Sequence, residues 1–400
     1  MLTLDRVYQA AHMLKEHVRK TDIISYSGMS CDHCDLFLKT ENLQVTGSFK
    51  IRGAYFKIAM LPEEERAKGV IACSAGNHAQ GVALAAQRMG IKSTIFIPSI
   101  APLSKVEATK RLGADVRLVD GVYDDAHEAA VIYQKESGAV FIHPFNDVDV
   151  IAGQGTIGLE ILDQMAALDA VVIPVGGGGL ISGMAFVIKK LNPACKVYGV
   201  QASGAGSMLL SLENNMLSHL TNISTFADGI AVKSPGDTTF DLCSQYVDQI
   251  VTVTDDEIAT AILTLMEQQK LVAEGAGAVA FAAVLLNKLP LENKTVCAIV
   301  SGGNIDVNIL SRVINRGLLT SGRLSEFKIE MLDKPGQLAE VSAIIADMGA
   351  NVTKVMHNPG GENTDINGCY LHISMETRNK EHFLAVKKAI QDAGHLIVEG

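Results

Sequence analysis

The fold of this chain is indicated most clearly by residues 171–183, which read VVIPVGGGGLISG. An apolar run rich in β-branched residues leads into four consecutive glycines, and apolar residues at helical spacing follow. A strand that enters a helix through a small-residue turn is typical of a parallel sheet. Consecutive glycines let several backbone N–H groups surround one anion, most simply a phosphate. The stretch therefore predicts a strand, an anion-binding loop and a helix, with a merely flexible loop as the alternative.

The same alternation of strands and helices extends over residues 69–300. Amphipathic stretches such as Ala79 to Met89 and Asp255 to Gln269 separate short β-branched runs, so we expect a mostly parallel sheet. Ligands of such sheets bind beyond the carboxyl ends of the strands, and functional residues are expected in the loops there. The expected strands are Val70 to Cys73, Ser93 to Pro98, Asp115 to Val119, Val140 to His143, Ala170 to Val175, Lys196 to Val200, Gln249 to Thr254 and Thr295 to Val300.

A second module is expected at the C-terminus. Residues 316–327 read RGLLTSGRLSEF, and their glycines predict a linker. We expect a first domain at 1–318, a linker at 319–324 and a second domain at 325–400. The second domain has a βαββαβ layout. Its expected elements are an extended run at Glu326 to Leu332, a helix that opens near Pro335, runs at Asn351 to Met356 and Tyr370 to Met375, a helix at Asn379 to Ala393 and a strand at Leu396 to Glu399.

The composition excludes several classes of protein. The 400 residues suit two or three domains of roughly 150 residues each. With 48% hydrophobic and 20% charged residues, the chain is expected to be neither disordered nor membrane-embedded. A formal net charge of −10 argues against a nucleic-acid partner. Seven scattered cysteines predict free thiols, and the N-terminal residues carry no secretory signal, so we expect a cytoplasmic location.

Lys50 is the first residue singled out for chemistry. It lies in residues 39–54, KTENLQVTGSFKIRGA, between Phe49 and Ile51. A lysine is ordinarily a solvated surface charge. Apolar neighbours favour the neutral amine instead, which suits imine formation and proton transfer. We therefore take Lys50 as a candidate catalytic residue.

A possible anion site begins at residues 73–81, CSAGNHAQG, which follow a strand and open a helix. Small residues there expose backbone N–H groups, and the positive potential of a helix start favours a carboxylate. His78 lies in this segment. A lone histidine at a helix start is more often a structural hydrogen-bonding group, so no catalytic role is assigned to His78.

Three patterns bear on which other ligands the chain binds. In residues 299–304, IVSGGN, Ser301 follows a strand and is a candidate hydrogen-bonding group for a buried polar atom. The glycine loop is a poor dinucleotide fingerprint, because Ile181 stands where the third glycine belongs and Gln201 where an acidic residue is expected. Cys31 to Cys34 resemble half of a metal site without a second half, so no metal is predicted.

Taken in order, the lysine, the helix start, the glycine loop and the Ser-Gly-Gly turn resemble the fold-type II pyridoxal-phosphate enzymes. The chain is most similar to the threonine dehydratase (threonine ammonia-lyase) family, and HPF at 143–145, DGIAV at 228–232 and EGAGA at 274–278 extend the likeness. Residues 333–355, DKPGQLAEVSAIIADMGANVTKV, resemble an ACT regulatory domain. The resemblance implies an α/β fold of the tryptophan synthase β type, with a two-subdomain, parallel-sheet catalytic body and a C-terminal βαββαβ ACT domain.

The resemblance also implies roles for individual residues. Lys50 would bind pyridoxal 5'-phosphate covalently and act as the general base, Phe49 would pack against its ring, Asn77 would bond its phenolic oxygen and Ser301 would face its pyridine nitrogen. The cofactor phosphate would bind to the backbone of Gly176, Gly177, Gly178, Gly179 and Leu180. The substrate carboxylate would bind at Ser74, Ala75, Gly76, Asn77 and His78. An amino-acid effector would bind at Asp333, Pro335, Gly336, Gln337, Leu338 and Asn351.

The implied reaction is the dehydration and deamination of L-threonine to 2-oxobutyrate and ammonia, with L-serine to pyruvate as a side activity. The resemblance further implies amino-acid allostery, usually isoleucine feedback, and a homo-oligomer, for which a tetramer is expected. Ala75 replaces the serine that racemases of this fold use, and residues 201–207, QASGAGS, lack the acids with which they bind a divalent cation. The alternatives are a serine-preferring dehydratase, a β-replacement enzyme, an NAD-linked oxidoreductase and a non-catalytic amino-acid sensor.

Overall fold

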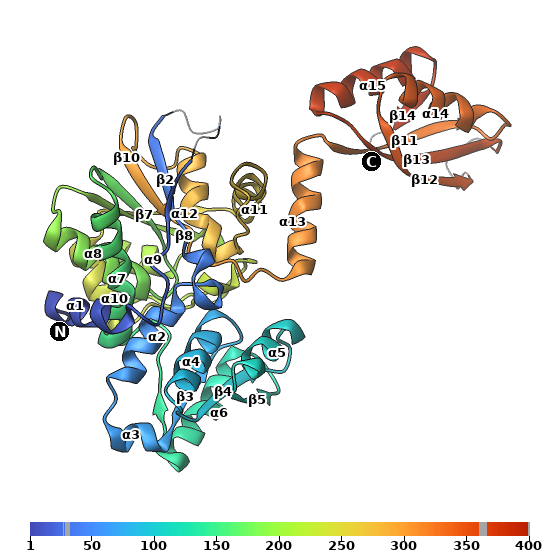
Figure 1. Cartoon of the computed structure of the whole chain (residues 1–400). Coiled ribbons are helices and arrows are strands. Elements are labelled where there is room, and N and C mark those ends of the chain that lie inside the picture. The colour runs from blue at the N-terminus through green and yellow to red at the C-terminus, as the bar shows by residue number, and fades with distance from the viewer. Residues whose placement is uncertain (27, 29–32, 360–365, 399–400) are drawn as a thin grey trace. The chain divides into compact units, whose positions relative to one another are not determined.

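The computed structural model describes residues 1–26, 28, 33–359 and 366–398. The chain forms two compact units, Met1–Val307 and Asn308–Gly400, which are described separately below (Figure 1). The domain and linker boundaries expected from the sequence stay a prediction. No helix within the described ranges is long and apolar enough to cross a membrane.

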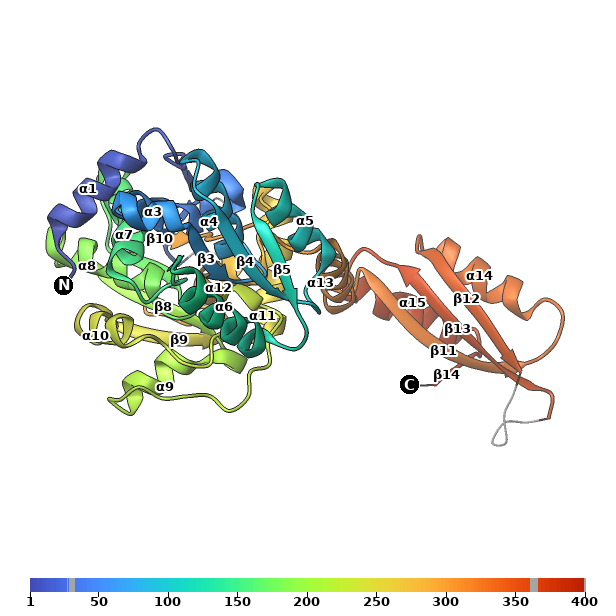
Figure 2. The same cartoon turned by 90° about the horizontal axis from the view of Figure 1, so that it is seen from below.

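The first unit is built around two sheets. The larger has the order β1-β2-β10-β7-β8-β9, in which only β1 and β2 pair antiparallel. The smaller is parallel throughout, in the order β5-β4-β3-β6 (Figure 2). The strands are β1 (Ile23–Ser25), β2 (Asp35–Lys39), β3 (Val70–Cys73), β4 (Ser93–Pro98), β5 (Asp115–Val119), β6 (Val140–Phe141), β7 (Ala170–Pro174), β8 (Lys196–Ala202), β9 (Gln249–Val253) and β10 (Thr295–Ile299).

Helices pack against both sheets of this unit. The helix α12 lies along β7, β8, β9 and β10, while α6 packs on β3, β4 and β5. The helices are α1 (Leu4–Leu14), α2 (Lys50–Ala59), α3 (Glu63–Lys68), α4 (Asn77–Arg88), α5 (Leu103–Arg111), α6 (Tyr123–Ser137), α7 (Val148–Gln164), α8 (Gly179–Leu191), α9 (Ser207–Glu213), α10 (Asp237–Tyr246), α11 (Asp255–Thr264) and α12 (Gly275–Leu285). The next helix, α13 (Val307–Thr320), starts at the last residue of this unit and otherwise belongs to the second unit. Short helical turns are η1 (Glu41–Leu43), η2 (Val45–Gly47), η3 (Ser203–Ala205), η4 (Asp228–Ile230) and the π-helical turn η5 (Leu265–Gln269).

The helix that begins with Lys50 crosses α7 at a contact between two glycines. A Cβ placed on Gly53 would lie 2.6 Å from the carbonyl oxygen of Val150, and one on Gly153 would lie 2.6 Å from the Cα of Gly53. Real Cβ atoms do not approach other atoms so closely, so the two backbones touch only because both residues lack a side chain. The position of α2 is thereby fixed by the backbone of α7.

The second unit is an antiparallel sheet covered by two helices. The strand order is β12-β13-β11-β14, and α14 and α15 lie on the same side of the sheet (Figure 1). Alternate residues of β13, including Leu371 and Ile373, are buried and pack with Val341 and Ile345 of α14. The elements are β11 (Leu324–Leu332), α14 (Gln337–Asp347), β12 (Asn351–Pro359), β13 (Gly368–Glu376), α15 (Lys380–Asp392) and β14 (Leu396–Val398).

The α/β fold class expected from the sequence is confirmed. The strands β3, β4 and β5 have the expected bounds, and the others differ from expectation by a few residues at one or both ends. Two strands were not anticipated, β1 and β2, because their short runs lie among charged residues without a helical neighbour. The glycine loop and the Ser-Gly-Gly turn follow β7 and β10, which are adjacent in the larger sheet.

Candidate active site

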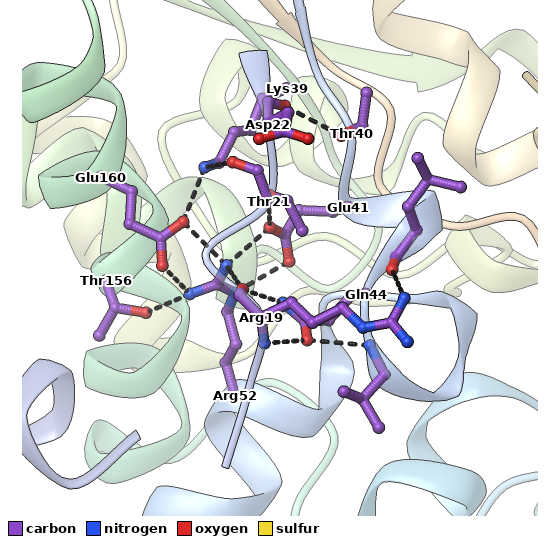
Figure 3. A network of polar contacts seen from close by, with 12 residues as sticks. Arg19, Thr21, Asp22, Lys39, Thr40, Glu41, Gln44, Arg52, Thr156 and Glu160 are labelled. Atoms are coloured by element: carbon purple, nitrogen blue, oxygen red, sulfur yellow. Dashed lines mark hydrogen bonds and ion pairs between the residues drawn. The ribbon is translucent and has the colours of Figure 1, made fainter. Parts of the chain in front are cut away.

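A buried charge network lies beside α2, two residues beyond Lys50 (Figure 3). Arg52 is fully buried. Its guanidinium donates to both carboxylate oxygens of Glu41, at 2.9 and 2.7 Å, and to both of Glu160, at 2.6 and 3.0 Å. The hydroxyl of Thr156 and the carbonyl of Arg19 accept further bonds from it. Every N–H of the guanidinium therefore has an acceptor.

Lys39 completes the network. Its buried Nζ donates to Glu160 at 2.7 Å, to the Thr21 carbonyl at 2.7 Å and to Gln164 at 2.8 Å. Two cations thus face two carboxylates. Burial alone would raise the pKa of Glu41, but Arg52 and Thr21 hold that pKa below its ordinary value. The network joins α2, the helix that begins with Lys50, to the end of β2, to α7 and to residues 19–21. It therefore fixes the position of α2.

Lys50 is the first residue of α2 and has no carboxylate partner at bonding distance within the described chain. Its Nζ donates to the carbonyl of Pro144 at 2.9 Å and lies 5.3 Å from the centre of the Phe49 ring. Burial lowers the pKa of Lys50 to about 8, against a smaller opposing effect of the Glu274 carboxylate. The neutral amine, which a nucleophile or base requires, is therefore far more accessible near neutral pH than in an exposed lysine.

The glycine loop lies against the same segment that binds Lys50. A Cβ on Gly177 would lie 2.4 Å from the Phe145 ring, and one on Gly179 would lie 2.9 Å from the Phe145 Cα. Gly178 has φ of +97°, and α8 begins at the next residue. Within the described ranges, the N–H groups from Gly176 to Leu180 donate to no protein acceptor. The loop and the helix start together form a site for an anion.

The helix α4 begins at the segment predicted to bind a carboxylate. The Gly76 N–H donates to the Ser74 hydroxyl at 3.1 Å, and a Cβ on Gly76 would meet nothing within 4 Å. His78 is buried, and its Nε2 contacts the Ile142 carbonyl at 2.7 Å. Burial, with the nearby charge of Lys50, lowers the pKa of His78 to about 3. His78 is therefore neutral in the ordinary pH range.

Glu274 is a site residue that the reasoning from individual residues missed. It is buried before the start of α12, and its Oε1 accepts a hydrogen bond from Asn77 Nδ2 at 2.5 Å. Burial, with the charge of Asp228, raises the pKa of Glu274 to about 7. EGAGA entered the sequence analysis only as part of a family resemblance. The available signal was a single acidic residue ahead of a wholly apolar helix.

The Ser-Gly-Gly turn joins these parts. Ser301 is buried, and its hydroxyl donates to the Ala276 carbonyl at 3.3 Å, while its own carbonyl accepts from the Phe49 N–H at 3.2 Å. Ser48 and Gly302 form a β-bridge. Lys50, Asn77, Glu274 and Ser301 are thus linked within one region by direct contacts and by the turn. The individual roles expected for these residues stay predictions.

An ion pair connects the two sheets of the first unit. Lys105 on α5, beside the smaller sheet, donates to Asp228 in η4. The lysine side chain is 14% exposed and the aspartate 61%. The pair lies near Glu274, whose pKa both charges affect.

The predicted effector residues do not all meet within one chain. Asp333 follows β11 and its N–H donates to the Asn367 carbonyl, while Gly336, with φ of +98°, precedes α14. The register pairs Asn351 with Glu376 and Leu332 with Gly368, at opposite ends of β13. Asn351 therefore lies at the far end of the sheet from Asp333. The motif beginning at Cys31 lies in part outside the described residues.

Two family models match this chain, one to each unit. The family "Pyridoxal-phosphate dependent enzyme" matches residues 14–302, and the ACT domain family matches residues 325–395. An L-threonine ammonia-lyase of Thermotoga maritima is 50% identical over 397 residues, covering 99% of this chain and 98% of that protein.

Solved structures resemble the larger part of the chain. Processed threonine deaminase isoform 2 from Solanum lycopersicum superposes with a TM-score of 0.74 at 39% identity, covering 79% of this chain and 94% of that chain. Maize serine racemase gives a TM-score of 0.74 at 35% identity, covering 79% of this chain and 98% of that chain.

Proposed function

Because this chain belongs to the pyridoxal-phosphate dependent enzyme family and carries an ACT domain, we propose that it converts L-threonine to 2-oxobutyrate and ammonia under control by an amino acid. The observation that carries this proposal is the 50% identity to an L-threonine ammonia-lyase over nearly the full length of both chains. The site geometry supplies the chemical basis. The enzyme is a lyase that depends on pyridoxal 5'-phosphate.

The residues present fit that cofactor. A phosphate is a suitable anion for the glycine loop, whose N–H groups from Gly176 to Leu180 have no acceptor in the described protein. An aldehyde reacts with the neutral form of an amine, and the lowered pKa of Lys50, about 8, makes that form more accessible than in an exposed lysine. The buried Ser48 hydroxyl, two residues before Lys50, has no hydrogen-bond partner within the described residues. Polar groups without a hydrogen-bond partner, such as these loop N–H groups and the Ser48 hydroxyl, are unusual in a site that binds no ligand.

The chain's own groups account for the elimination. Pyridoxal 5'-phosphate, when bound, would supply an electron sink that makes the α-proton of the substrate acidic. The Lys50 Nζ then takes that proton as general base, a role worth roughly 10²–10⁴ in rate. The backbone from Ser74 to His78 holds the substrate carboxylate at the start of α4. Loss of the β-hydroxyl with the α-proton releases water, and hydrolysis of the product yields 2-oxobutyrate and ammonia.

Racemisation is the competing reaction, because maize serine racemase has a similar structure. A racemase must return a proton to the face opposite the lysine. The side chain at position 75 is a methyl group, which has no proton to give. Elimination is therefore favoured over racemisation, and L-serine is proposed as a second substrate that yields pyruvate.

The ACT domain supports control by an amino-acid effector. We propose an amino acid, of the branched-chain class tested below, as the effector, a homotetramer as the assembly and the cytoplasm as the location. A substrate-saturation curve with and without branched-chain amino acids tests the regulation. An unchanged curve would contradict it.

The central test is to trap and map the cofactor. Borohydride reduction of the protein loaded with pyridoxal phosphate is expected to label Lys50, and a label elsewhere would overturn the proposal. Incubation with threonine, serine, or O-acetylserine plus sulfide, followed by product identification, separates the dehydratases from a β-replacement enzyme. Bound NAD in place of pyridoxal phosphate would indicate an oxidoreductase. Absence of turnover in fully loaded protein would indicate a sensor.

A further inference from the structure

Three side chains form a continuous hydrogen-bonded chain at the site. Asn304 Nδ2 donates to the Thr46 carbonyl and to Asn77 Oδ1, both at 2.7 Å. Asn77 Nδ2 then donates to Glu274 Oε1. The chain runs from the loop that precedes Lys50, across the start of α4, to the start of α12.

The two ends of this chain determine its direction. A backbone carbonyl only accepts hydrogen bonds, so Asn304 must turn its amide nitrogen toward Thr46. An ionised carboxylate also only accepts, so Asn77 must turn its amide nitrogen toward Glu274. The oxygen of Asn77 then faces Asn304, and the reversed orientation of the Asn77 amide would oppose two acceptors. One N–H of Asn77 remains, with no acceptor among the described residues.

We propose that Glu274 and Asn304 are positioning residues that lock the Asn77 amide so that it presents an N–H donor to the cofactor's phenolic oxygen. This inference rests on the proposed function. A donor at that oxygen favours its ionised form, whereas an acceptor would disfavour it. The lock therefore selects the charge state of the bound cofactor.

Packing leaves the locked side chains little freedom. A Cβ on Gly302 would lie 2.2 Å from Glu274 Oε1 and 3.2 Å from Asn77 Nδ2, so the Ser-Gly-Gly turn lies directly against this pair. A Cβ on Gly47 would lie 2.5 Å from Asn304 Oδ1. Gly47 itself has φ of +71°. The turn and the lysine loop thus enclose both ends of the chain.

Charged groups around Glu274 influence whether its carboxyl group is ionised and can accept the hydrogen bond from Asn77. Asp228, Lys105 and Lys50 are the charged groups whose fields reach it. Burial and Asp228 raise the pKa of Glu274 to about 7. Glu274 is an acceptor-only group chiefly above that pH. Substitutions that differ in hydrogen bonding at constant charge are therefore the cleanest probes.

The test compares Glu274→Gln with Glu274→Leu. Both remove the charge, but only glutamine keeps an oxygen that can accept from Asn77. We expect Glu274→Gln to bind pyridoxal phosphate with a Kd within about threefold of wild type, and Glu274→Leu to bind at least about tenfold more weakly. The pH at which the bound cofactor changes its absorbance should be about one unit higher in Glu274→Leu, which is a tenfold loss in preference for the ionised form.

Asn304→Ala gives an independent measurement without any change of charge. It should raise the same absorbance midpoint and weaken cofactor binding. It also tests the proposal if Glu274→Leu fails to fold. Glu257→Leu is the matched control, because Glu257 also lies at a helix start, in the first turn of α11, where it caps the helix and pairs with Lys288. It should change neither cofactor measurement.

Equal behaviour of Glu274→Gln and Glu274→Leu in both measurements, or a wild-type midpoint in Asn304→Ala, would overturn the lock. Failure of the wild-type protein to bind pyridoxal phosphate at Lys50 would instead overturn the proposed function. The two failures are therefore distinguishable.

Discussion

Two groups of largely buried charged residues lie around α2, and they differ in whether the charges are paired with one another. The network around Arg52 pairs two cations with two carboxylates and satisfies each donor of the guanidinium. The active site at the start of α2 holds the half-buried Lys50 and the buried Glu274 without pairing them directly, and the pKa of each is shifted so that its neutral form is favoured. The first arrangement stabilises a structure and the second prepares groups for proton transfer. Burial alone does not show whether a charged residue stabilises the structure or takes part in proton transfer.

Lys50→Met should show the difference between the paired and the unpaired charges most strongly, because it should lower activity and raise stability. Activity should fall at least about 10³-fold because the cofactor anchor and base are lost. The folded state lowers the pKa of Lys50 to about 8, so the buried ammonium opposes folding below that pH and less so as the pH rises above it. The apo-protein variant should therefore be more stable than wild type by about 3 kcal/mol near neutral pH. Denaturant unfolding at several pH values measures this, and a large loss of stability would contradict the comparison.

Arg52→Met should have the reverse effect. Removing Arg52 leaves the buried Glu41 without its cation and the half-buried Glu160 with Lys39 alone, which costs about 3–5 kcal/mol of unfolding free energy. Arg19→Met is the control, because the Arg19 side chain is exposed and only its carbonyl binds Arg52. Chemical denaturation of both variants gives the difference. Similar stabilities would show that the network contributes little.

Gly178→Ala tests the anion loop. Gly178 has φ of +97°, and a Cβ would lie 2.6 Å from Met208 Cε and 2.8 Å from Thr239 Cβ. Strain and overpacking should cost about 2–3 kcal/mol and weaken pyridoxal-phosphate binding. Gly349→Ala also adds a side chain at positive φ, +75°, but meets nothing within 4 Å. Comparing unfolding free energies isolates the contact, and equal losses would assign the whole effect to the backbone.

Glu274→Gln should stabilise the apo-protein in alkaline solution. The folded state raises the pKa of Glu274 to about 7, so wild type loses stability as the pH rises from the ordinary glutamate pKa to about 7. The variant lacks this loss and should be more stable by about 3 kcal/mol above pH 7. The difference should disappear in acid. A constant difference at all pH values would show that Glu274 does not titrate abnormally.

His78→Asn should have the smallest effect. The pKa of His78 is about 3, so its charge does not change in the pH range where the enzyme would work. Loss of the contact with the Ile142 carbonyl should cost about 1 kcal/mol, with no change in the shape of the rate–pH profile. A changed profile would assign His78 a role in proton transfer.

The sequence predicted elements better than side-chain partners. The parallel strands and the glycine loop follow from local patterns of apolar residues and glycines. Arg52 and Glu41 lie in the same quoted segment as Lys50, yet no periodic pattern shows that they meet across η1 and α2. Glu274 and Asn77 are 197 residues apart in sequence, and their contact depends on strand order, which a single sequence does not reveal. The active-site partners therefore required the structure.

The strength of the ion pair between Lys105 and Asp228 should depend on the salt concentration of the solution. The pair joins helices beside different sheets, and its carboxylate is largely exposed, so dissolved ions screen it readily. The contribution of this pair to stability should therefore fall as salt concentration rises, whereas the contribution of the buried network around Arg52 should change little.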